Sequence, residues 1–231
     1  MLTAKKKISV REPIQESAFQ NNWTSIQFTF NQYKKTILGV LLGIIGIAVV
    51  AFIYFSQQSA ANEEASQFLA TAIPLYEQQQ YRLSIDGDRT RNVMGLKEIV
   101  DNYSSTGAGD VARLYLGNAY LALGEFDNAV NVFKDAHPSG DIIKAGILAG
   151  LGGAYEGKKD FLNAAEQFEK SAKTFNDEVI AADRLIQAAR NYSLANQKQK
   201  AKEILELVKN DYKSTRFARD IDRYLAELAG E

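Results

Sequence analysis

An uncharged run of nineteen residues, from Ile37 to Phe55, constrains this chain more than any other feature of its sequence. As an α-helix with a rise of 1.5 Å per residue, the run spans about 28 Å, close to the roughly 30 Å hydrocarbon core of a bilayer. The sequence therefore predicts one transmembrane helix over residues 36–56. A tail of residues 1–35 precedes this helix, and one domain of residues 57–231 follows it.

A cleaved secretory signal is the alternative interpretation of the run, because Ser59, Ala60 and Ala61 are small enough for a peptidase. The apolar core of a signal is typically about 7–15 residues long, however, and about thirty-five residues precede this one. We therefore expect an uncleaved, single-pass anchor in the lipid bilayer. Gly39 and Gly43 form a GxxxG spacing within it, which permits pairing with a second helix and hence a homo- or hetero-oligomer.

The basic residues are distributed unevenly around the anchor, and this asymmetry predicts its orientation. Six of them precede the run, and the first one after it is Arg82. Because Lys and Arg are retained on the cytoplasmic side, the N-terminus is expected in the cytoplasm and residues 57–231 outside it. We expect a bacterial inner-membrane protein whose C-terminal domain is periplasmic, in the sense of lying outside that membrane. The six basic residues before the run are Lys5, Lys6, Lys7, Arg11, Lys34 and Lys35.

Aromatic and aliphatic residues recur in the tail at spacings of four and three, which would place them on one helix face. This pattern predicts an amphipathic helix over residues 19–33 at the cytoplasmic membrane surface. An irregular leader is the alternative, and Ile26, Phe28 and Phe30 also fit strand alternation. Residues before Phe19 are predicted to be disordered. The recurring residues are Phe19, Trp23, Ile26, Phe30 and Tyr33.

Charge and cysteine content exclude several classes of function. The chain has 27 basic and 28 acidic residues, of which six and two lie in the tail, so 21 and 26 remain in the exported part. Its net charge of −5 argues against sequence-independent binding to nucleic acid or to anionic lipid. The chain has no cysteine, so disulfides, thiol catalysis and thiolate metal sites are all excluded.

An internal repeat is the strongest signal after the anchor. One stretch matches a second with a period of 35 residues, and a fainter third copy follows at an offset of 37. Each copy predicts two helices that meet at a short turn, with small residues allowing close approach. A diverged earlier unit is predicted from helices over residues 68–80 and 93–103, with residues 82–91 as a loop, and a closing helix contains Tyr224, Leu225 and Leu228. The first copy is Leu116, Gly117, Tyr120, Gly124, Phe126, Ala129, Phe133 and Ala136; the second is Leu151, Gly152, Tyr155, Lys159, Phe161, Ala164, Phe168 and Ser171; the third is Ala188, Ala189, Tyr192, Asn196, Lys198, Ala201, Leu205 and Val208.

This pattern resembles the tetratricopeptide repeat (TPR) over about residues 62–231. Among the departures from the motif, Lys159 and Asn196 replace the turn glycine, Lys198 replaces the aromatic residue, and no proline closes either central repeat. The resemblance implies an all-α fold, a TPR-like α-solenoid of paired antiparallel helices with a C-terminal capping helix. By its single anchor followed by repeats, the chain is also similar to the family of ancillary SecYEG translocon subunits and to membrane-anchored TPR-like proteins.

The resemblance further implies a groove, lined by the first helix of each pair, that receives a peptide or a partner helix. Asn118 is expected to hold a ligand backbone through its amide, and Arg190 to pair with a carboxylate. The alternative is that these side chains pack internally or face water. The groove positions carried over from the family are Leu114, Asn118, Leu121, Ala149, Gly153, Glu156, Ile186 and Arg190.

No catalytic, metal or cofactor site is predicted. His137 is the only histidine and lies directly before Pro138 in a predicted turn. Asp86 and Asp88 lack the other ligands of a calcium loop, and the glycines of residues 146–153 fit close helix packing better than a nucleotide site, because no strand precedes them.

Two functions follow, neither of them enzymatic. The first is a membrane-anchored adaptor or chaperone-like accessory subunit of the protein-export translocon, with protein or peptide partners. The second is a structural accessory subunit of another membrane complex, without client binding.

Overall fold

The computed structural model describes residues 14–138 and 140–230. Contacts divide the chain into two compact units, Met1–Ser56 and Gln57–Glu231, and each is described by itself. The predicted all-α class is confirmed, because helices account for nearly all of the described structure and the only sheet among these residues has two short strands.

The first helix, α1, comprises Ile14–Glu77 and includes Pro74 in its last turn. Its backbone is helical over residues 19–33, as predicted, and the helix begins five residues before Phe19, so the prediction of disorder is wrong for residues 14–18. The rest of that prediction falls on residues 1–13, outside the described part. The amphipathic arrangement of residues 19–33 stays a prediction, since the side chains of residues 14–31 are not described.

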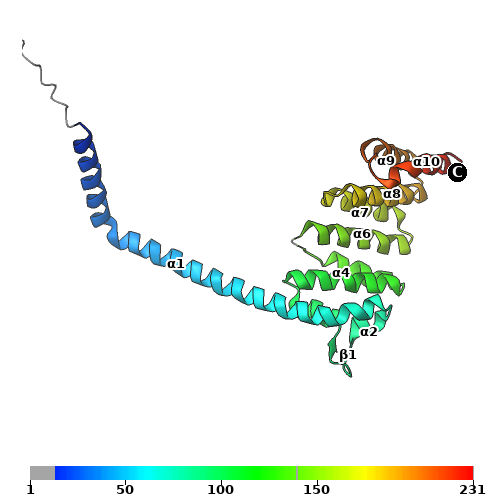
Figure 1. Ribbon diagram of the computed structural model, residues 1–231, viewed down its shortest axis with the longest axis horizontal. Helices are drawn as coiled ribbons and strands as arrows, with labels where there is room; N and C mark the ends of the chain where they lie inside the picture. The colour runs from blue at the N-terminus through cyan, green and yellow to red at the C-terminus, as the bar shows by residue number, and fades with distance from the viewer. Residues whose placement is uncertain (1–13, 139, 231) are drawn as a thin grey trace, which may run out of the picture. The chain divides into compact units, whose positions relative to one another are not determined.

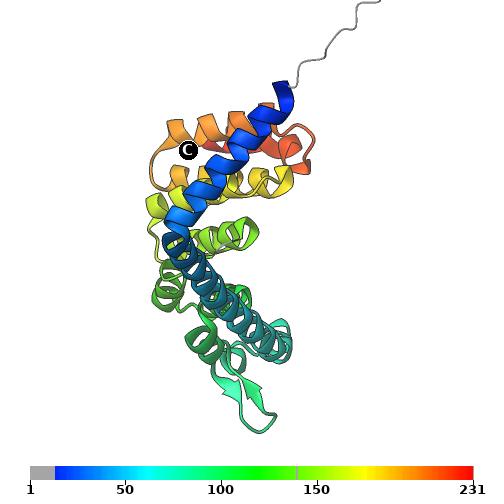
Figure 2. The same cartoon turned by 90° about the vertical axis from the view of Figure 1, so that its left-hand side faces the viewer.

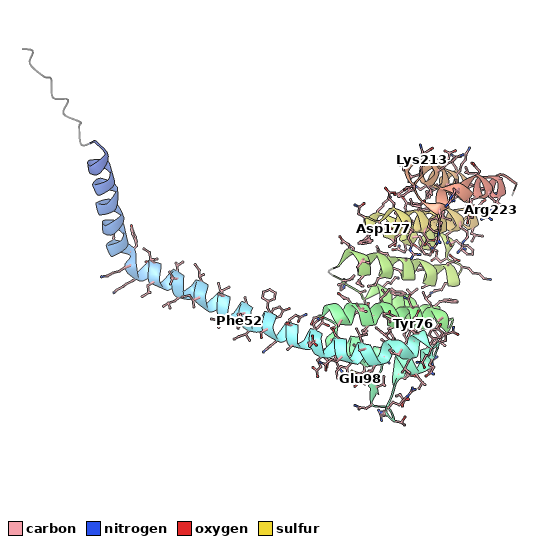
Figure 3. The ribbon with its side chains drawn as sticks, viewed as in Figure 1. Phe52, Tyr76, Glu98, Asp177, Lys213 and Arg223 are labelled. Carbon is pink, nitrogen blue, oxygen red and sulfur yellow. The ribbon has the colours of Figure 1, made fainter. Side chains whose placement is uncertain are left out.

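One described helix is long and apolar enough to cross a membrane. Within Gln32–Glu77, the most apolar window has a mean hydropathy of 2.8, and none of it is buried inside the protein. Large apolar side chains in this segment project outward, among them Phe52 with an exposed fraction of 74% (Figure 3). Water is a poor solvent for such a surface, whereas lipid acyl chains match it.

The C-terminal unit is a stack of helices in which neighbours in the chain pack against each other (Figure 1). It contains the last part of α1, a short helix, two strands and a series of longer helices, each with an apolar face turned inward. The elements after α1 are α2 (Tyr81–Asp86), β1 (Gly87–Asp88), β2 (Val93–Met94), α3 (Leu96–Tyr103), α4 (Gly107–Ala122), α5 (Phe126–Lys134), α6 (Asp141–Gly157), α7 (Phe161–Thr174), α8 (Glu178–Leu194), α9 (Lys198–Asp211), the 3₁₀ helix η1 (Arg216–Asp220) and α10 (Ile221–Gly230).

Within the described part of this unit, four turns of the same kind join helices. At each turn one residue has a positive φ, and two backbone N–H groups bond back to the end of the preceding helix. Gly124, with φ of 73°, suits this conformation, but Lys159 and Asn196 adopt φ values of 62° and 61° without glycine. A side chain in this region costs roughly 1–2 kcal/mol. The substitutions that weaken the sequence motif therefore leave the turn itself unchanged.

The fourth such turn, at Gln79 with φ of 61°, redefines the first helix pair. It joins α1 to α2, so the second helix of this pair begins at Tyr81 and not near Val93. The predicted loop over residues 82–91 is wrong for its first half, because residues 82–86 belong to α2. An antiparallel hairpin then pairs Gly87 with Met94 and projects from the helices of this unit (Figure 2).

Glycines let aromatic rings of one helix reach the backbone of the next. The ring of Phe133, which is 2% exposed, lies between Gly117 of α4 and Gly150 of α6, and a Cβ atom on either glycine would overlap it. Phe168 packs on Gly152 in the same way. These contacts show that Gly150 and Gly152 of α6 serve close helix packing.

Candidate functional site

The predicted groove positions lie on three helices, α4, α6 and α8, that are the first members of their pairs. Two of the three positions of this row on α6, Ala149 and Gly153, have little or no side chain, and leucines of α4 lie near the backbone of this helix. A Cβ atom on Gly146 would lie 3.2 Å from a methyl carbon of Leu114, and one on Gly153 would lie 3.6 Å from a methyl carbon of Leu121. Leu121 and Gly153 are thus brought together across two helices, whereas Leu114 lies against Gly146, earlier on α6.

Asn118 on α4 and Ala149 on α6 differ in how far they are exposed. Asn118 is half-buried, and its amide has no hydrogen-bond partner among the residues that the structure describes. Its binding to a ligand backbone stays a prediction. Ala149 is only 8% exposed and belongs to the apolar core around α7 and α8, so it contributes packing and little accessible surface.

Glu156 and Arg190 form an ion pair between α6 and α8. The Arg190 guanidinium donates to Oε1 of Glu156 at 2.5 Å, and Nδ2 of Asn191 donates to Oε2 at 2.7 Å. Burial opposes ionisation of Glu156, but the hydrogen bonds from Arg190 and Asn191 outweigh it and hold the pKa of this carboxyl below its ordinary value. The carboxylate that Arg190 was expected to bind is therefore supplied by the protein itself.

This pKa shift predicts a pH-dependent contribution to stability. A carboxyl whose pKa is depressed on folding stabilises the fold above its unfolded pKa, near 4.5, and this contribution is lost as the pH falls through the folded pKa. We expect Glu156→Gln to lower the free energy of unfolding by about 1 kcal/mol at pH 7, after discounting for solvent screening of exposed Arg190. In urea titrations the difference from the wild type should shrink at pH 3.

Glu206→Gln is the matched control for that experiment. The only ion-pair partner of Glu206 among the described residues is Lys202, at 3.9 Å on the same exposed helix face, so its removal should change stability little. A Glu156→Gln deficit that is equally large at pH 3 would contradict the assignment to the charged pair.

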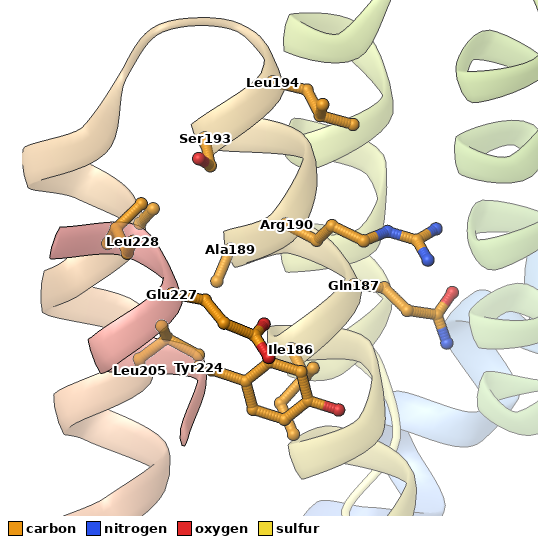
Figure 4. A pocket seen from close by; sticks show the side chains of 11 residues that line it. Ile186, Gln187, Ala189, Arg190, Ser193, Leu194, Leu205, Tyr224, Glu227 and Leu228 are labelled. Atoms are coloured by element: carbon orange, nitrogen blue, oxygen red, sulfur yellow. The ribbon is translucent and has the colours of Figure 1, made fainter. Parts of the chain in front are cut away.

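A pocket of about 220 Å³ opens beside Arg190, between α8, α9 and α10 (Figure 4). Its apolar floor includes Ala189, Ala201 and Leu205, and its walls combine aliphatic, aromatic and polar side chains. Two predicted groove residues line it, Ile186 and Arg190, so the structure extends the predicted site at its C-terminal end. The complete lining is Ile186, Gln187, Ala189, Arg190, Ser193, Leu194, Ala201, Leu205, Tyr224, Glu227 and Leu228.

The residues from α10 were missed as site residues. The sequence predicts a closing helix that contains Tyr224 and Leu228, but neither residue is among the predicted groove positions. Both do contact the core of the last helices, and they line the pocket as well. This second role depends on how α10 packs on α8 and α9, so the sequence of α10 held no signal for it.

Comparison with known proteins adds no assignment. No protein-family model matches the chain, and no curated protein matches it.

Proposed function

We propose that this chain is a membrane-anchored, TPR-like adaptor that binds polypeptides on the exported side of a bacterial inner membrane. In this proposal the helix pairs form an α-solenoid, α10 caps it, and the row on α4, α6 and α8 receives extended segments. The adaptor serves as an accessory or chaperone-like subunit of the protein-export translocon. It performs no enzymatic reaction and uses no cofactor.

The open pocket at the end of the row carries the proposal. Ligand sites are concave and mostly apolar, with a few polar groups that fix orientation, and this pocket has that composition. The four equivalent turns support the solenoid, since they give each helix pair the same internal connection, as expected of a repeated unit. The Lys/Arg asymmetry supports the orientation.

A fixed structural subunit is the second candidate. It is favoured because predicted groove residues already have partners within the protein. Arg190 is paired with Glu156, and Leu114 packs on Gly146. Side chains that already have partners within the protein leave few groups free for changing clients, as expected of a surface for one permanent partner.

Photocrosslinking in intact membranes distinguishes the two functions. A benzophenone amino acid at Asn118 or Leu194 should capture many products of different sizes if the protein is an adaptor. The same group at Lys202, on the exposed face of α9, is the control and should capture few. A single product of constant size from the first two positions would support the structural subunit. Crosslinks no stronger than those of the control would reject a binding role for this row.

A further inference from the structure

The polar groups at the pocket on α8, α9 and α10 differ in whether they are already engaged. The Arg190 side chain points away from α10, toward the side where it meets Glu156, whereas Glu227 extends from α10 toward α8 (Figure 4). Gln187 donates its amide N–H to Asp183 at 2.7 Å, which leaves its carbonyl oxygen as an acceptor. The charged group that faces across the pocket is therefore a carboxylate.

The negative charge of Glu227 is only weakly compensated by other groups of the protein. Its only ion-pair partner among the described residues is Arg223, at 3.9 Å, and the side chain of Glu227 is 63% exposed. The guanidinium of Arg223 also lies 5.1 Å from the ring centroid of Tyr224, on its own helix. An incoming cation would thus meet a carboxylate that the protein holds only loosely.

The Glu227 carboxylate and the Gln187 carbonyl oxygen lie beside the apolar floor of the pocket. Leu194 is 54% exposed at the edge of the pocket, and Ala189, Ala201 and Leu205 form a floor that is almost fully buried. The floor favours an aliphatic or aromatic side chain because burying it removes apolar surface from water. Glu227 and the Gln187 carbonyl favour a positively charged neighbour, in keeping with the net charge of −5 on residues 57–231.

We propose that this pocket binds an apolar side chain of an extended polypeptide segment in which a Lys or Arg lies next to that side chain. The apolar group enters over Ala189, and the cation pairs with Glu227. This inference rests on the proposed adaptor function and specifies the chemistry of its client. It excludes acidic segments and free carboxylate termini as preferred ligands of the pocket.

Peptide binding to the full-length protein in uncharged detergent tests the proposal. The probes are two fluorescein-labelled peptides that differ only in the residues flanking a central leucine, Lys in one and Glu in the other. By fluorescence anisotropy, the Lys peptide should bind more tightly than the Glu peptide, and its affinity should fall as salt is added.

Two variants test the site itself. Glu227→Gln should weaken binding of the Lys peptide by about two- to fivefold and reduce its salt dependence, as expected for a partly exposed ion pair. Glu206→Gln is the matched control, since Glu206 has the same kind of partner at 3.9 Å and does not line the pocket. Ser193→Phe should fill the pocket and abolish binding, with an unchanged melting temperature showing that the fold persists.

Each contrary outcome points to one failure. Equal or tighter binding of the Glu peptide, or no effect of Glu227→Gln, overturns the proposed charge preference and with it the inference. Binding that survives Ser193→Phe in a folded protein places the client elsewhere and overturns the pocket while leaving the adaptor function standing. Absence of peptide binding together with many crosslinks from Asn118 would likewise overturn the pocket and leave the adaptor function standing. Absence of both rejects the adaptor function itself.

Discussion

Replacing Phe133 with alanine should lower the free energy of unfolding by about 3–5 kcal/mol, the largest loss we expect from any single substitution in the C-terminal unit. The ring is 2% exposed and belongs to α5, but it touches the backbone of α4 at Gly117 and of α6 at Gly150. Its removal leaves a cavity where three helices meet. Urea titration followed by far-ultraviolet circular dichroism measures this loss.

The two glycines provide a sharper form of this prediction. Gly150→Ala should destabilise the wild type by roughly 1–3 kcal/mol, because its Cβ atom would overlap the Phe133 ring. In the Phe133→Ala background the obstruction is gone, so the same change should stabilise the protein by about 0.5–1 kcal/mol, the ordinary gain of Gly→Ala inside a helix. The sign reversal is the signature of direct contact.

Gly153→Ala controls for effects on α6 alone. It lies on the same helix, but a Cβ atom there would be 3.6 Å from Leu121, which is ordinary van der Waals contact. We expect it to be neutral or stabilising in both backgrounds. If Gly150→Ala destabilised the protein equally with and without Phe133, the ring would not be what excludes a side chain at residue 150.

The repeat could be recognised from sequence because its helix pairs are built from local signals. Helices α4 to α9 begin close to where the offsets of 35 and 37 residues place them, since apolar spacing and small residues act within each pair. The turns at Lys159 and Asn196 form as well, although neither residue is glycine. Here the packing of the flanking helices outweighs the modest cost of a positive φ.

The parts that were mispredicted depend on information outside the local pattern. Helix α2 is only six residues long and ends in the hairpin, so its apolar period is too short to distinguish it from a loop. Glu156 and Arg190 are 34 residues apart, and their pairing requires the register between α6 and α8. The contribution of Glu227 to a pocket likewise depends on how α10 packs, which spacing within α10 does not specify.

The membrane anchor that we propose for the apolar run of α1 leads to the second large effect. Ile47 lies near the middle of the apolar run and has an exposed fraction of 72%. A lysine at the centre of a membrane helix costs roughly 2.5–3.5 kcal/mol on the translocon scale, which corresponds to a shift of about 50-fold or more in the insertion equilibrium. We expect Ile47→Lys to move most of the protein from the carbonate-resistant membrane pellet to the supernatant or to aggregates.

Gln32→Lys is the matched control, because it adds the same charge where the sequence already places Lys34 and Lys35 on the predicted cytoplasmic side. It should leave membrane retention unchanged, since positive charge there agrees with the expected orientation. Epitope tags at both ends add an independent readout, because an uncleaved anchor keeps both tags on one polypeptide in the pellet. If the C-terminal tag instead appeared alone in the soluble exported fraction, residues 37–55 would act as a removable signal, and every proposal that requires a tethered domain would fall with the anchor.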